Sequence, residues 1–422
     1  MIAVIHPSVI KGMIPAPASK SMMQRACALA LLHTGETVIS NPGASQDDLA
    51  AISIIQQLGA TVSSKNGQLN IHSTGMINPS GKVDCGESGL SFRMFSAIAA
   101  LSREEVVING MGSLMERPMH FLKEVFPLLG VQCSLNNGYL PAIIHGPMVP
   151  TDIRIDGSQS SQYLTGLLFA MAKAAKKQVT ITVDNLVSKP YINMSLSMLS
   201  LFGYEVHHED HRIFTINPAT QRKETIELNI EGDWSSAAFL LVAGLLAGPV
   251  TITGLDPHSA QADKAILNVL KSCRATIENK HSGYTVVCPQ PLKPFQFDAT
   301  DSPDLFPPLV ALAAHCTGVS VIKGISRLAG KESDRAQTLK KVFEGMGISI
   351  HLKGDDMHIT GGMIQAAKVD SHHDHRIAMA AAIAALSAKG PVEIDHAEAV
   401  NKSYPSFYSD LQMLGASVSL FN

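Results

Sequence analysis

The sequence predicts an α/β protein built from six related modules, and two repeated patterns along its 422 residues support this fold class. One pattern is a short helix-to-strand junction that usually contains glycine. The other is a strongly apolar helix followed at once by a β-branched strand. Together they describe a module that runs apolar helix, strand, loop, amphipathic helix and hairpin.

The first junction, Leu58-Gly59-Ala60-Thr61-Val62, ends an amphipathic helix and begins an alternating strand. A glycine at this point fits a helix end that needs a positive φ. The junction returns at intervals of about 70 residues or twice that, at Gly130, Gly203, Gly347 and Gly415, and the double interval holds a degenerate copy, Cys273-Arg274-Ala275-Thr276-Ile277. The interval exceeds the roughly 20–50 residues of a solenoid repeat, so each module has the size of a subdomain.

Each module also contains a helix that is apolar on every side and must therefore be buried. These helices are expected at Ser21–Leu32, Ser91–Leu101, Ser161–Ala175, Ser235–Ala247, Asp304–Cys316 and His375–Ala388. The strands that follow them are expected at Glu36–Ser40, Glu105–Asn109, Gln178–Val183, Val250–Thr253, Val319–Ile322 and Val392–Ile394.

The starts of these apolar helices are polar in every module. They read Ser19-Lys20-Ser21, Glu87-Ser88-Gly89, Ser160-Ser161-Gln162, Asp233, Asp304 and Asp374-His375-Arg376. Related modules place related helix ends in similar positions, so several amino ends, with free N–H groups and partial positive charge, should point toward one region. Such a region favours anions.

Composition limits the function further. The 33 basic and 36 acidic side chains give a net charge of −3, which provides no overall field for nucleic acid. Six cysteines without a CxxC pair (Cys27, Cys85, Cys133, Cys273, Cys288 and Cys316) indicate a reducing compartment. The start lacks a signal peptide, and no apolar run approaches the ~20 residues that cross a bilayer. We therefore expect a cytoplasmic protein that binds neither membranes nor nucleic acid.

Lys20 lies at the positive end of a helix dipole, where a cation is unfavourable unless an anion joins it. Arg25 should share the face of Ser21, and Arg93 should extend from the first helical turn after Gly89. For each cation the alternative is a solvated surface side chain. The cations at comparable module junctions are Lys20, Arg25, Arg93, Arg117, Lys331, Arg335, Arg376 and Lys402. In a net acidic protein they predict two small phosphorylated, carboxylated ligands.

Two carboxylates lie among these basic residues. Asp304 begins an apolar helix, and the alternative is that it only caps that helix. Glu332 is flanked by Lys331 and Arg335, and the alternative is a solvated charged run. Nearby cations would keep Glu332 ionised, whereas a general acid or base needs a pKa near the working pH, which bound anions could restore.

Neutral and histidine-rich segments complete the candidates. The hydroxyls and amide of residues 158–162 suit a polyol or a phosphate as well as a helix cap, and Ser188 is open to both interpretations. The tract His372-His373-Asp374-His375-Arg376 has neither HExxH nor zinc-ribbon spacing, and Arg376 would repel a metal ion. We expect no metal there.

In chain order, the motifs SKSxxxR (19–25), ESGxxxR (87–93), ERP (116–118), SxSSQ (158–162), SKPY (188–191), KESDR (331–335) and DHR (374–376), with Lys402, resemble the enolpyruvyl transferase family. The resemblance covers the whole chain. It implies two domains of three βαβαββ modules each, at residues 20–231 and at 1–19 plus 232–422, with buried parallel helices and a substrate cleft between the domains.

The resemblance is to the members that transfer enolpyruvyl from phosphoenolpyruvate to the 5-hydroxyl of shikimate 3-phosphate, releasing phosphate through a tetrahedral ketal, in aromatic amino-acid biosynthesis. It implies that phosphoshikimate is held by Ser21, Arg25, Ser160, Ser161, Gln162 and Ser188, and phosphoenolpyruvate by Lys20, Gly89, Arg117, Arg335, Arg376 and Lys402. Arg93 also belongs to the substrate-binding set. Asp304 would accept the hydroxyl proton, Glu332 would exchange a proton with the methylene carbon, and Lys20 would be catalytic as well. Lys331 would assist at the sugar-like ring and the leaving group. The resemblance implies no cofactor, and we expect a monomer.

The chain departs from the family at a few positions. Leu90 stands where threonine is usual, beside Gly89, and predicts reduced sensitivity to glyphosate; Arg327 replaces a common asparagine, and Ala18 a common glycine. One alternative is the family branch that acts on UDP-N-acetylglucosamine, but Lys20 is not followed by asparagine and residues 112–118 contain no cysteine. Another is a non-catalytic anion-binding relative, although Asp304 and Glu332 are both present.

Overall fold

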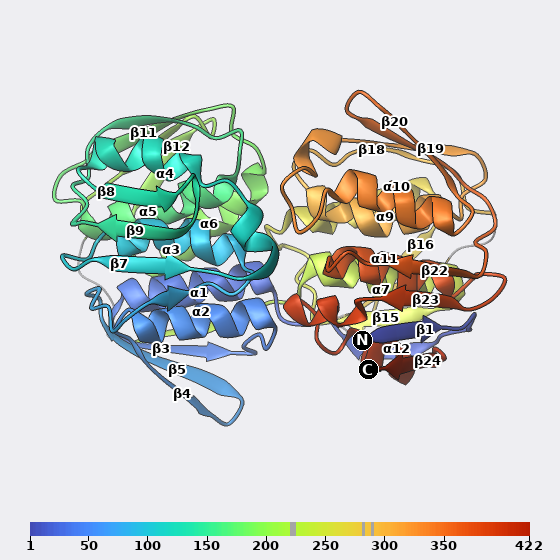
Figure 1. Cartoon of the computed structure of the whole chain (residues 1–422). Coiled ribbons are helices and arrows are strands. Elements are labelled where there is room, and N and C mark those ends of the chain that lie inside the picture. Colours follow the sequence, from blue (N-terminus) through green and yellow to red (C-terminus); the bar gives the residue numbers. More distant parts are fainter. Residues whose placement is uncertain (220–224, 281–282, 288–290) are drawn as a thin grey trace. The chain divides into compact units, whose positions relative to one another are not determined.

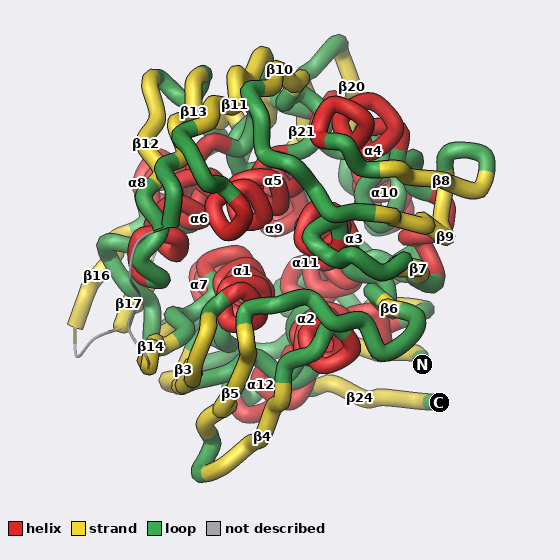
Figure 2. Tube along the Cα trace, turned by 90° about the vertical axis from the view of Figure 1, so that its left-hand side faces the viewer, coloured by secondary structure: helices red, strands yellow, loops and turns green. Residues whose placement is uncertain are grey.

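The structure, a computed structural model, describes residues 1–219, 225–280, 283–287 and 291–422, so Cys288 lies outside the described residues. The chain divides into two compact units (Figure 1). Unit 1 comprises Met1–Pro17 and Glu231–Asn422, and unit 2 comprises Ala18–Ile230. Within each unit the helices lie inside and the sheets toward the outside (Figure 1; Figure 2).

Unit 2 contains three four-stranded sheets with one shared topology. Their orders are β14(Thr225–Asn229)-β3(Thr34–Ser40)-β5(Gln68–Thr74)-β4(Thr61–Lys65), β6(Val83–Asp84)-β7(Val106–Asn109)-β9(Tyr139–His145)-β8(Gln132–Asn136) and β10(Ile153–Asp156)-β11(Val179–Asp184)-β13(Ile213–Ile216)-β12(Val206–Glu209). In each sheet the first two strands are parallel and the remaining pairs are antiparallel.

Unit 1 repeats this topology three times. Its sheets are β2(Gly12–Pro15)-β15(Val250–Thr253)-β17(Gly283–Val287)-β16(Thr276–Lys280), β18(Gln296–Asp298)-β19(Val319–Lys323)-β21(Asp356–Thr360)-β20(Ser349–Lys353) and β22(Ala367–Asp370)-β23(Val392–Asp395)-β1(Ile2–Ile5)-β24(Val418–Phe421). The amino-terminal strand β1 completes the last sheet, antiparallel to both neighbours. The six predicted modules are confirmed.

Three inner helices pack on one another in each unit, and each set lies in its own apolar core. They are α1(Lys20–Leu32), α3(Gly89–Ala99) and α5(Ser161–Ala174) in unit 2, and α7(Trp234–Ala247), α9(Phe306–Ala313) and α11(His375–Ala385) in unit 1. All six predicted apolar helices are present, with ends that differ by a few residues. Asp304 lies in a 3-10 turn, η4(Pro303–Leu305), before α9 rather than in the α-helix.

The outer helices are the amphipathic elements of the modules. They are α2(Gln46–Gln57), α4(His120–Val125) with η2(Phe126–Leu129), α6(Lys189–Leu201), η3(Ala262–Ala265) with α8(Ile266–Ser272), α10(Arg335–Gly345) and α12(Phe407–Met413). Three short 3-10 turns follow the strands β7, β19 and β23, which come after inner helices. They are η1(Gly112–Glu116), η5(Ile325–Arg327) and η6(Ala397–Lys402).

The junction residues adopt the predicted conformation. Gly59, Gly130, Gly203, Gly347 and Gly415 have φ angles of 111°, 72°, 76°, 87° and 102°. In the degenerate copy, Arg274 occupies the same place with φ 73°, although a side chain is strained there. The junction therefore preserves its backbone geometry even where glycine is lost.

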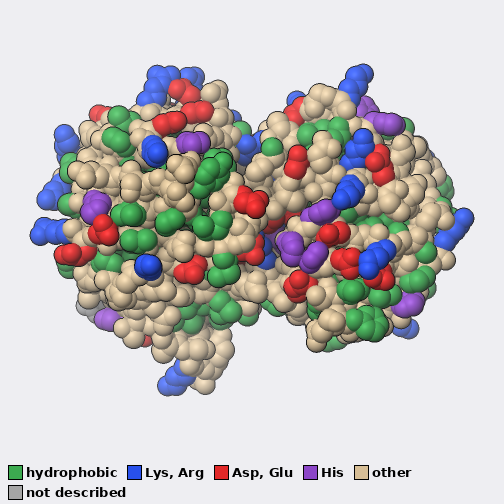
Figure 3. Space-filling model, viewed as in Figure 1, with side chains coloured by type: hydrophobic (Ala, Val, Ile, Leu, Met, Phe, Trp, Pro, Cys, Tyr) green, Lys and Arg blue, Asp and Glu red, His purple; other side chains and the backbone are tan. Residues whose placement is uncertain are grey.

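Basic and acidic side chains are interspersed on the face drawn in Figure 3. No helix in the described part of the chain is both long enough and apolar enough to span a bilayer.

Candidate functional site

Unit 1 gathers seven charged residues from four segments, which we call the unit 1 cluster: Asp304, Lys331, Glu332, Arg335, Asp374, Arg376 and Lys402. Arg335, the first residue of α10, lies at its centre with only 1% of its side chain exposed. Its guanidinium donates to Asp304 Oδ1 at 3.0 Å, to Glu332 Oε2 at 2.6 Å and to Asp374 Oδ2 at 3.0 Å. One buried arginine thus joins three carboxylates.

Asp304 lies among cations and does not cap its helix. Its carboxylate accepts from Arg376 Nη2 at 3.1 Å and is 3.5 Å from Lys331 Nζ, in addition to the Arg335 bond. The capping alternative is therefore wrong: Ser302 holds the N-cap position of η4. Burial raises the pKa of Asp304, but attraction by Arg376, Lys331 and Arg335 outweighs it and holds this pKa below its usual range.

Glu332 is also drawn into the cluster. Its side chain is only 12% exposed and contacts Arg335 and, at 3.7 Å, Lys402 Nζ. The solvated alternative for Glu332 is therefore wrong. The pKa of Lys331 is lowered, chiefly by burial, although the charge of Asp304 opposes the shift.

Asp374 is a member of the cluster that the sequence analysis did not propose as a site residue. It caps α11 by accepting the Arg376 backbone N–H at 3.0 Å, and it also accepts from Ser333 Oγ at 3.1 Å. Its position directly before a predicted helix was the available signal. Asp374 thereby fixes Arg335 and the start of the segment that carries Arg376.

In unit 2, Arg25 is buried, with 1% exposure, and it bonds neutral oxygens. It donates to Ser195 Oγ at 2.9 Å, to the Ser21 carbonyl at 2.8 Å and to the Tyr191 carbonyl at 3.4 Å. Arg25 therefore lies on the helix face of Ser21, as predicted, and the alternative of a solvated surface side chain is wrong. Burial lowers the pKa of Arg25 to about 10, and the electrostatic effect of Tyr191 only partly opposes it.

Gly89 lies against two guanidinium groups at the start of α3. A Cβ atom on Gly89 would be 2.7 Å from Arg117 Nη1 and 3.0 Å from Arg93 Nη1. Arg93 donates to Gln162 Oε1 at 2.8 Å and lies over the Tyr163 ring, 5.6 Å from its centroid. Gly89, Arg93, Arg117 and Gln162 are therefore brought together. Arg117 is buried, so its surface-loop alternative is wrong.

The start of α1 carries Lys20, whose ammonium group is 2.9 Å from Asp47 Oδ2. Ser19 caps the helix by accepting from Met22 N–H. The sequence predicts a ligand anion that offsets Lys20, but the chain itself supplies a carboxylate there. Burial raises the pKa of the neighbouring Asp48 to about 6, against hydrogen bonds from Ser45.

The predicted serines also lie at helix starts. Ser160 caps α5 by accepting from Gln162 N–H at 3.2 Å, and Ser161 is the buried first residue of that helix. Ser188 is buried in a left-handed conformation, φ 54°, directly before α6. The Gln24 amide oxygen accepts from Ser88 and Ser91, so the starts of α1 and α3 are joined.

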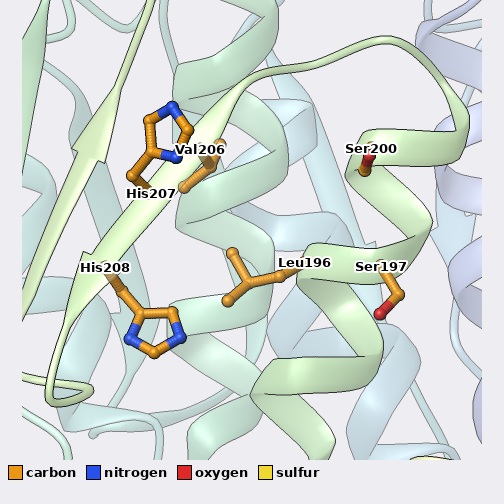
Figure 4. Close-up of a pocket in the computed structure, with 6 residues that line it drawn as sticks. All are labelled: Leu196, Ser197, Ser200, Val206, His207 and His208. Carbon is orange, nitrogen blue, oxygen red and sulfur yellow. The ribbon is translucent and has the colours of Figure 1, made fainter.

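Two other features lie apart from these clusters. In the described ranges no group of three or more His, Cys, Asp or Glu side chains could hold a metal ion. A shallow groove of about 610 Å³ lies on α6 and β12 (Figure 4) and is lined by Leu196, Ser197, Ser200, Val206, His207 and His208. The groove includes none of the predicted site residues.

Comparison with known proteins gives one consistent result. The model of the family described as EPSP synthase (3-phosphoshikimate 1-carboxyvinyltransferase) matches residues 4–411. The chain is 34% identical to the 3-phosphoshikimate 1-carboxyvinyltransferase of Aeropyrum pernix, over 98% of this chain and 96% of the relative. It is 37% identical to that of Thermococcus kodakarensis, over 96% and 98%. The EPSP synthase structure from Acinetobacter baumannii superposes with a TM-score of 0.83 at 26% identity, covering 99% of this chain and 100% of that one.

Proposed function

The chain belongs to the EPSP synthase family, and from that membership we propose that it transfers the enolpyruvyl group of phosphoenolpyruvate to the 5-hydroxyl of shikimate 3-phosphate and releases phosphate. The observation that carries the proposal is the unit 1 cluster, in which Asp304 and Glu332 share one buried arginine. A relative that only bound anions would gain nothing from two carboxylates at the ligand site.

We assign the proton transfers to unit 1. Asp304 accepts the hydroxyl proton, Glu332 exchanges a proton with the methylene carbon, and Lys331 assists departure of phosphate. The low pKa of Asp304 supports an ionised acceptor but makes it a weak base without ligands. Substrate anions that bind Arg376 and Arg335 would compete for their positive charge, raise the basicity of Asp304 and so switch on the base only when the substrates are present.

The proposal assigns each substrate its own set of binding residues. Phosphoshikimate contacts Ser21, Arg25, Ser160, Ser161, Gln162 and Ser188, and Arg93 holds the Gln162 amide in place. Phosphoenolpyruvate contacts Lys20, Gly89, Arg117, Arg335, Arg376 and Lys402. Cations and oriented N–H groups stabilise the charge that develops during addition and elimination without a cofactor.

Phosphate release from phosphoenolpyruvate tests the proposal. The purified protein is supplied in parallel with shikimate 3-phosphate or with UDP-N-acetylglucosamine as acceptor. We expect release with the first acceptor only. Release with the second would assign the chain to the other branch, and binding of phosphoshikimate without any release would support the non-catalytic alternative.

A further inference from the structure

The histidine-rich tract before Arg376 has no role in the proposed chemistry, yet it forms an ordered structure. Asp370, the last residue of β22, accepts the His372 backbone N–H at 2.7 Å and lies 2.8 Å from His396 Nδ1. The His373 ring lies against the His396 ring, with centroids 3.9 Å apart. Asp370 thus contacts two histidines, and the third packs on one of them.

This arrangement joins two loops that leave the adjacent parallel strands β22 and β23. Ser371 N–H donates to the Asp395 carbonyl at 3.1 Å, and Ser371 Oγ donates to the His396 carbonyl at 3.0 Å. With the Asp370–His396 bond, three hydrogen bonds connect the loops over two or three residues of each. We call this connection the loop clasp.

The backbone of the clasp is held in an unfavourable conformation. His372, His373 and His396 have φ angles of 51°, 55° and 55°, in the left-handed region that few residues other than glycine adopt, although asparagine, aspartate and histidine do so more often than the rest. Strained residues of this kind persist where surrounding contacts impose them, and they concentrate near functional sites. Hydrogen bonds from His396 and His372 N–H hold the pKa of Asp370 below its usual range although burial raises it, so the acceptor stays charged.

Each joined loop leads directly to a member of the unit 1 cluster. The first passes through Asp374, the cap of α11, to Arg376 in its first turn. The second begins η6 at His396, its N-cap residue, and that turn ends at Lys402. Helix α11 and η6 also contact each other. The relative positions of Arg376 and Lys402 therefore depend on how the two loop starts are fastened.

We propose that Asp370 and His396 are positioning residues: their hydrogen bond fastens the loop before α11 to the start of η6 and thereby sets the spacing of Arg376 and Lys402. The inference rests on the proposed function, in which both cations hold phosphoenolpyruvate. Breaking the loop clasp should then weaken the binding of phosphoenolpyruvate more than that of phosphoshikimate. Several charged side chains must contact one small anion, so a displacement of a fraction of an ångström lowers the affinity.

The main test replaces His396 by glycine. Glycine accepts a φ of 55° without strain, so His396→Gly removes the imidazole bond and leaves the backbone conformation accessible. We expect the KM for phosphoenolpyruvate to rise about tenfold, with a much smaller change in kcat and in the KM for phosphoshikimate. His396→Asn, whose amide can donate from the same place and which tolerates this φ, should restore most of the affinity.

A matched control is His211→Gly. His211 also has a positive φ, 56°, and hydrogen bonds through its ring, but it lies in the β12–β13 turn of unit 2. His211→Gly should leave the KM values for phosphoenolpyruvate and for phosphoshikimate unchanged. Asp370→Ala removes the bond to His396 and also the one from the His372 N–H, so it should raise the KM for phosphoenolpyruvate at least as much as His396→Gly. The double variant should be no worse than Asp370→Ala alone, because that variant has already lost the bond to His396.

Equal rises in both KM values, failure of His396→Asn to rescue, or additive single effects would overturn the positioning role. Calorimetric titration of the same variants with phosphoenolpyruvate alone measures the effect on binding without turnover, because the acceptor substrate is absent. A wild-type protein that releases no phosphate would refute the proposed function, while a selective loss of phosphoenolpyruvate binding in His396→Gly would still support the clasp.

Discussion

Arg25 in unit 2 and Arg335 in unit 1 are both fully buried, but their surroundings are opposite. In unit 2, the buried Arg25 and the half-buried Arg93 donate to hydroxyl, carbonyl and amide oxygens. In unit 1, Arg335 and Arg376 donate to carboxylates. Burial lowers the pKa of Arg25 to about 10, whereas in Arg335 and Arg376 the opposing carboxylates overcome burial and raise the pKa.

This difference indicates different roles for the two arginines, one in ligand binding and one beside the groups that transfer protons. A buried guanidinium that lacks a carboxylate partner is electrostatically incomplete, and an anionic ligand completes it. The unit 1 cations are already balanced by the acidic groups to which we assign proton transfer, so a ligand must compete with those groups. Arg25 is thus suited to bind an anion, whereas an anion that binds the unit 1 cations also changes the carboxylates beside them.

Replacing the proposed proton acceptor should have the largest effect. Asp304→Asn keeps the shape of the side chain but cannot accept the hydroxyl proton, so we expect kcat to fall about 10²–10⁴-fold. Phosphoshikimate binding, measured by calorimetry, should remain, because Arg25 and its neighbours lie in unit 2. An unchanged kcat would remove Asp304 from the mechanism.

Removing the central arginine of unit 1 should cost the most stability. Arg335→Met leaves Asp304, Glu332 and Asp374 without their shared buried cation, and loss of one partner of a buried ion pair typically costs about 3–5 kcal/mol. Urea denaturation of the ligand-free protein at neutral pH measures the loss. A destabilisation under 1 kcal/mol would show that the carboxylates do not depend on Arg335.

The corresponding change in unit 2 should behave differently. Arg25→Met removes a buried charge that no carboxylate balances, so the ligand-free protein should keep its stability or gain about 1 kcal/mol. The stabilisation by phosphoshikimate, about 2.7 kcal/mol at a hundredfold excess over Kd, should disappear. Destabilisation as large as that of Arg335→Met would break the comparison between the units.

The carboxylates of the two units should also give opposite pH dependences. Because the pKa of Asp48 is raised to about 6, its stabilising contribution is complete below the unfolded pKa of about 3.9 and is lost as pH rises through 6. Asp48→Asn stays neutral and retains an acceptor for Ser45, so it should exceed wild type by about 2 kcal/mol at pH 8 and lose this advantage near pH 4.

Asp304 provides the contrast within the same experiment. Its pKa is lowered, so its contribution is present above about pH 3.9 and is lost as pH falls through the folded-state value. Asp304→Asn should therefore be less stable than wild type at pH 8 and approach it in acid. Denaturation midpoints between pH 4 and pH 8 show whether each variant is more or less stable than wild type. If both variants changed stability in the same direction, burial of the Asp48 carboxylate could not be the cause of its raised pKa.

The sequence predicted the helices and strands far better than it predicted which side chains contact each other. Glycine at the junctions and apolar residues on all sides of six helices are local patterns, and they located the modules to within a few residues. Ser195, whose hydroxyl accepts a hydrogen bond from Arg25, lies 170 residues away along the chain, and no local sequence pattern connects the two residues. Asp47 is one of two adjacent acids in the first turn of α2, and only packing against α1 selects it for Lys20.

The smallest predicted effect concerns a junction rather than a cluster. All three junctions of unit 2 have glycine at the left-handed position, whereas unit 1 has the exposed Arg274 at one of its three, with φ 73°. A side chain there costs roughly 1 kcal/mol, partly offset because glycine has more freedom in the unfolded chain. Arg274→Gly should therefore stabilise by about 0.5 kcal/mol.

The reverse change supplies the control. Gly203→Ala places a Cβ in open space at φ 76°, so any loss comes from backbone strain and not from crowding. It should destabilise by about 1 kcal/mol in chemical denaturation. If Arg274→Gly were also destabilising, the guanidinium would have to make a contact worth more than the strain, and the degenerate junction would be a functional substitution instead of a tolerated one.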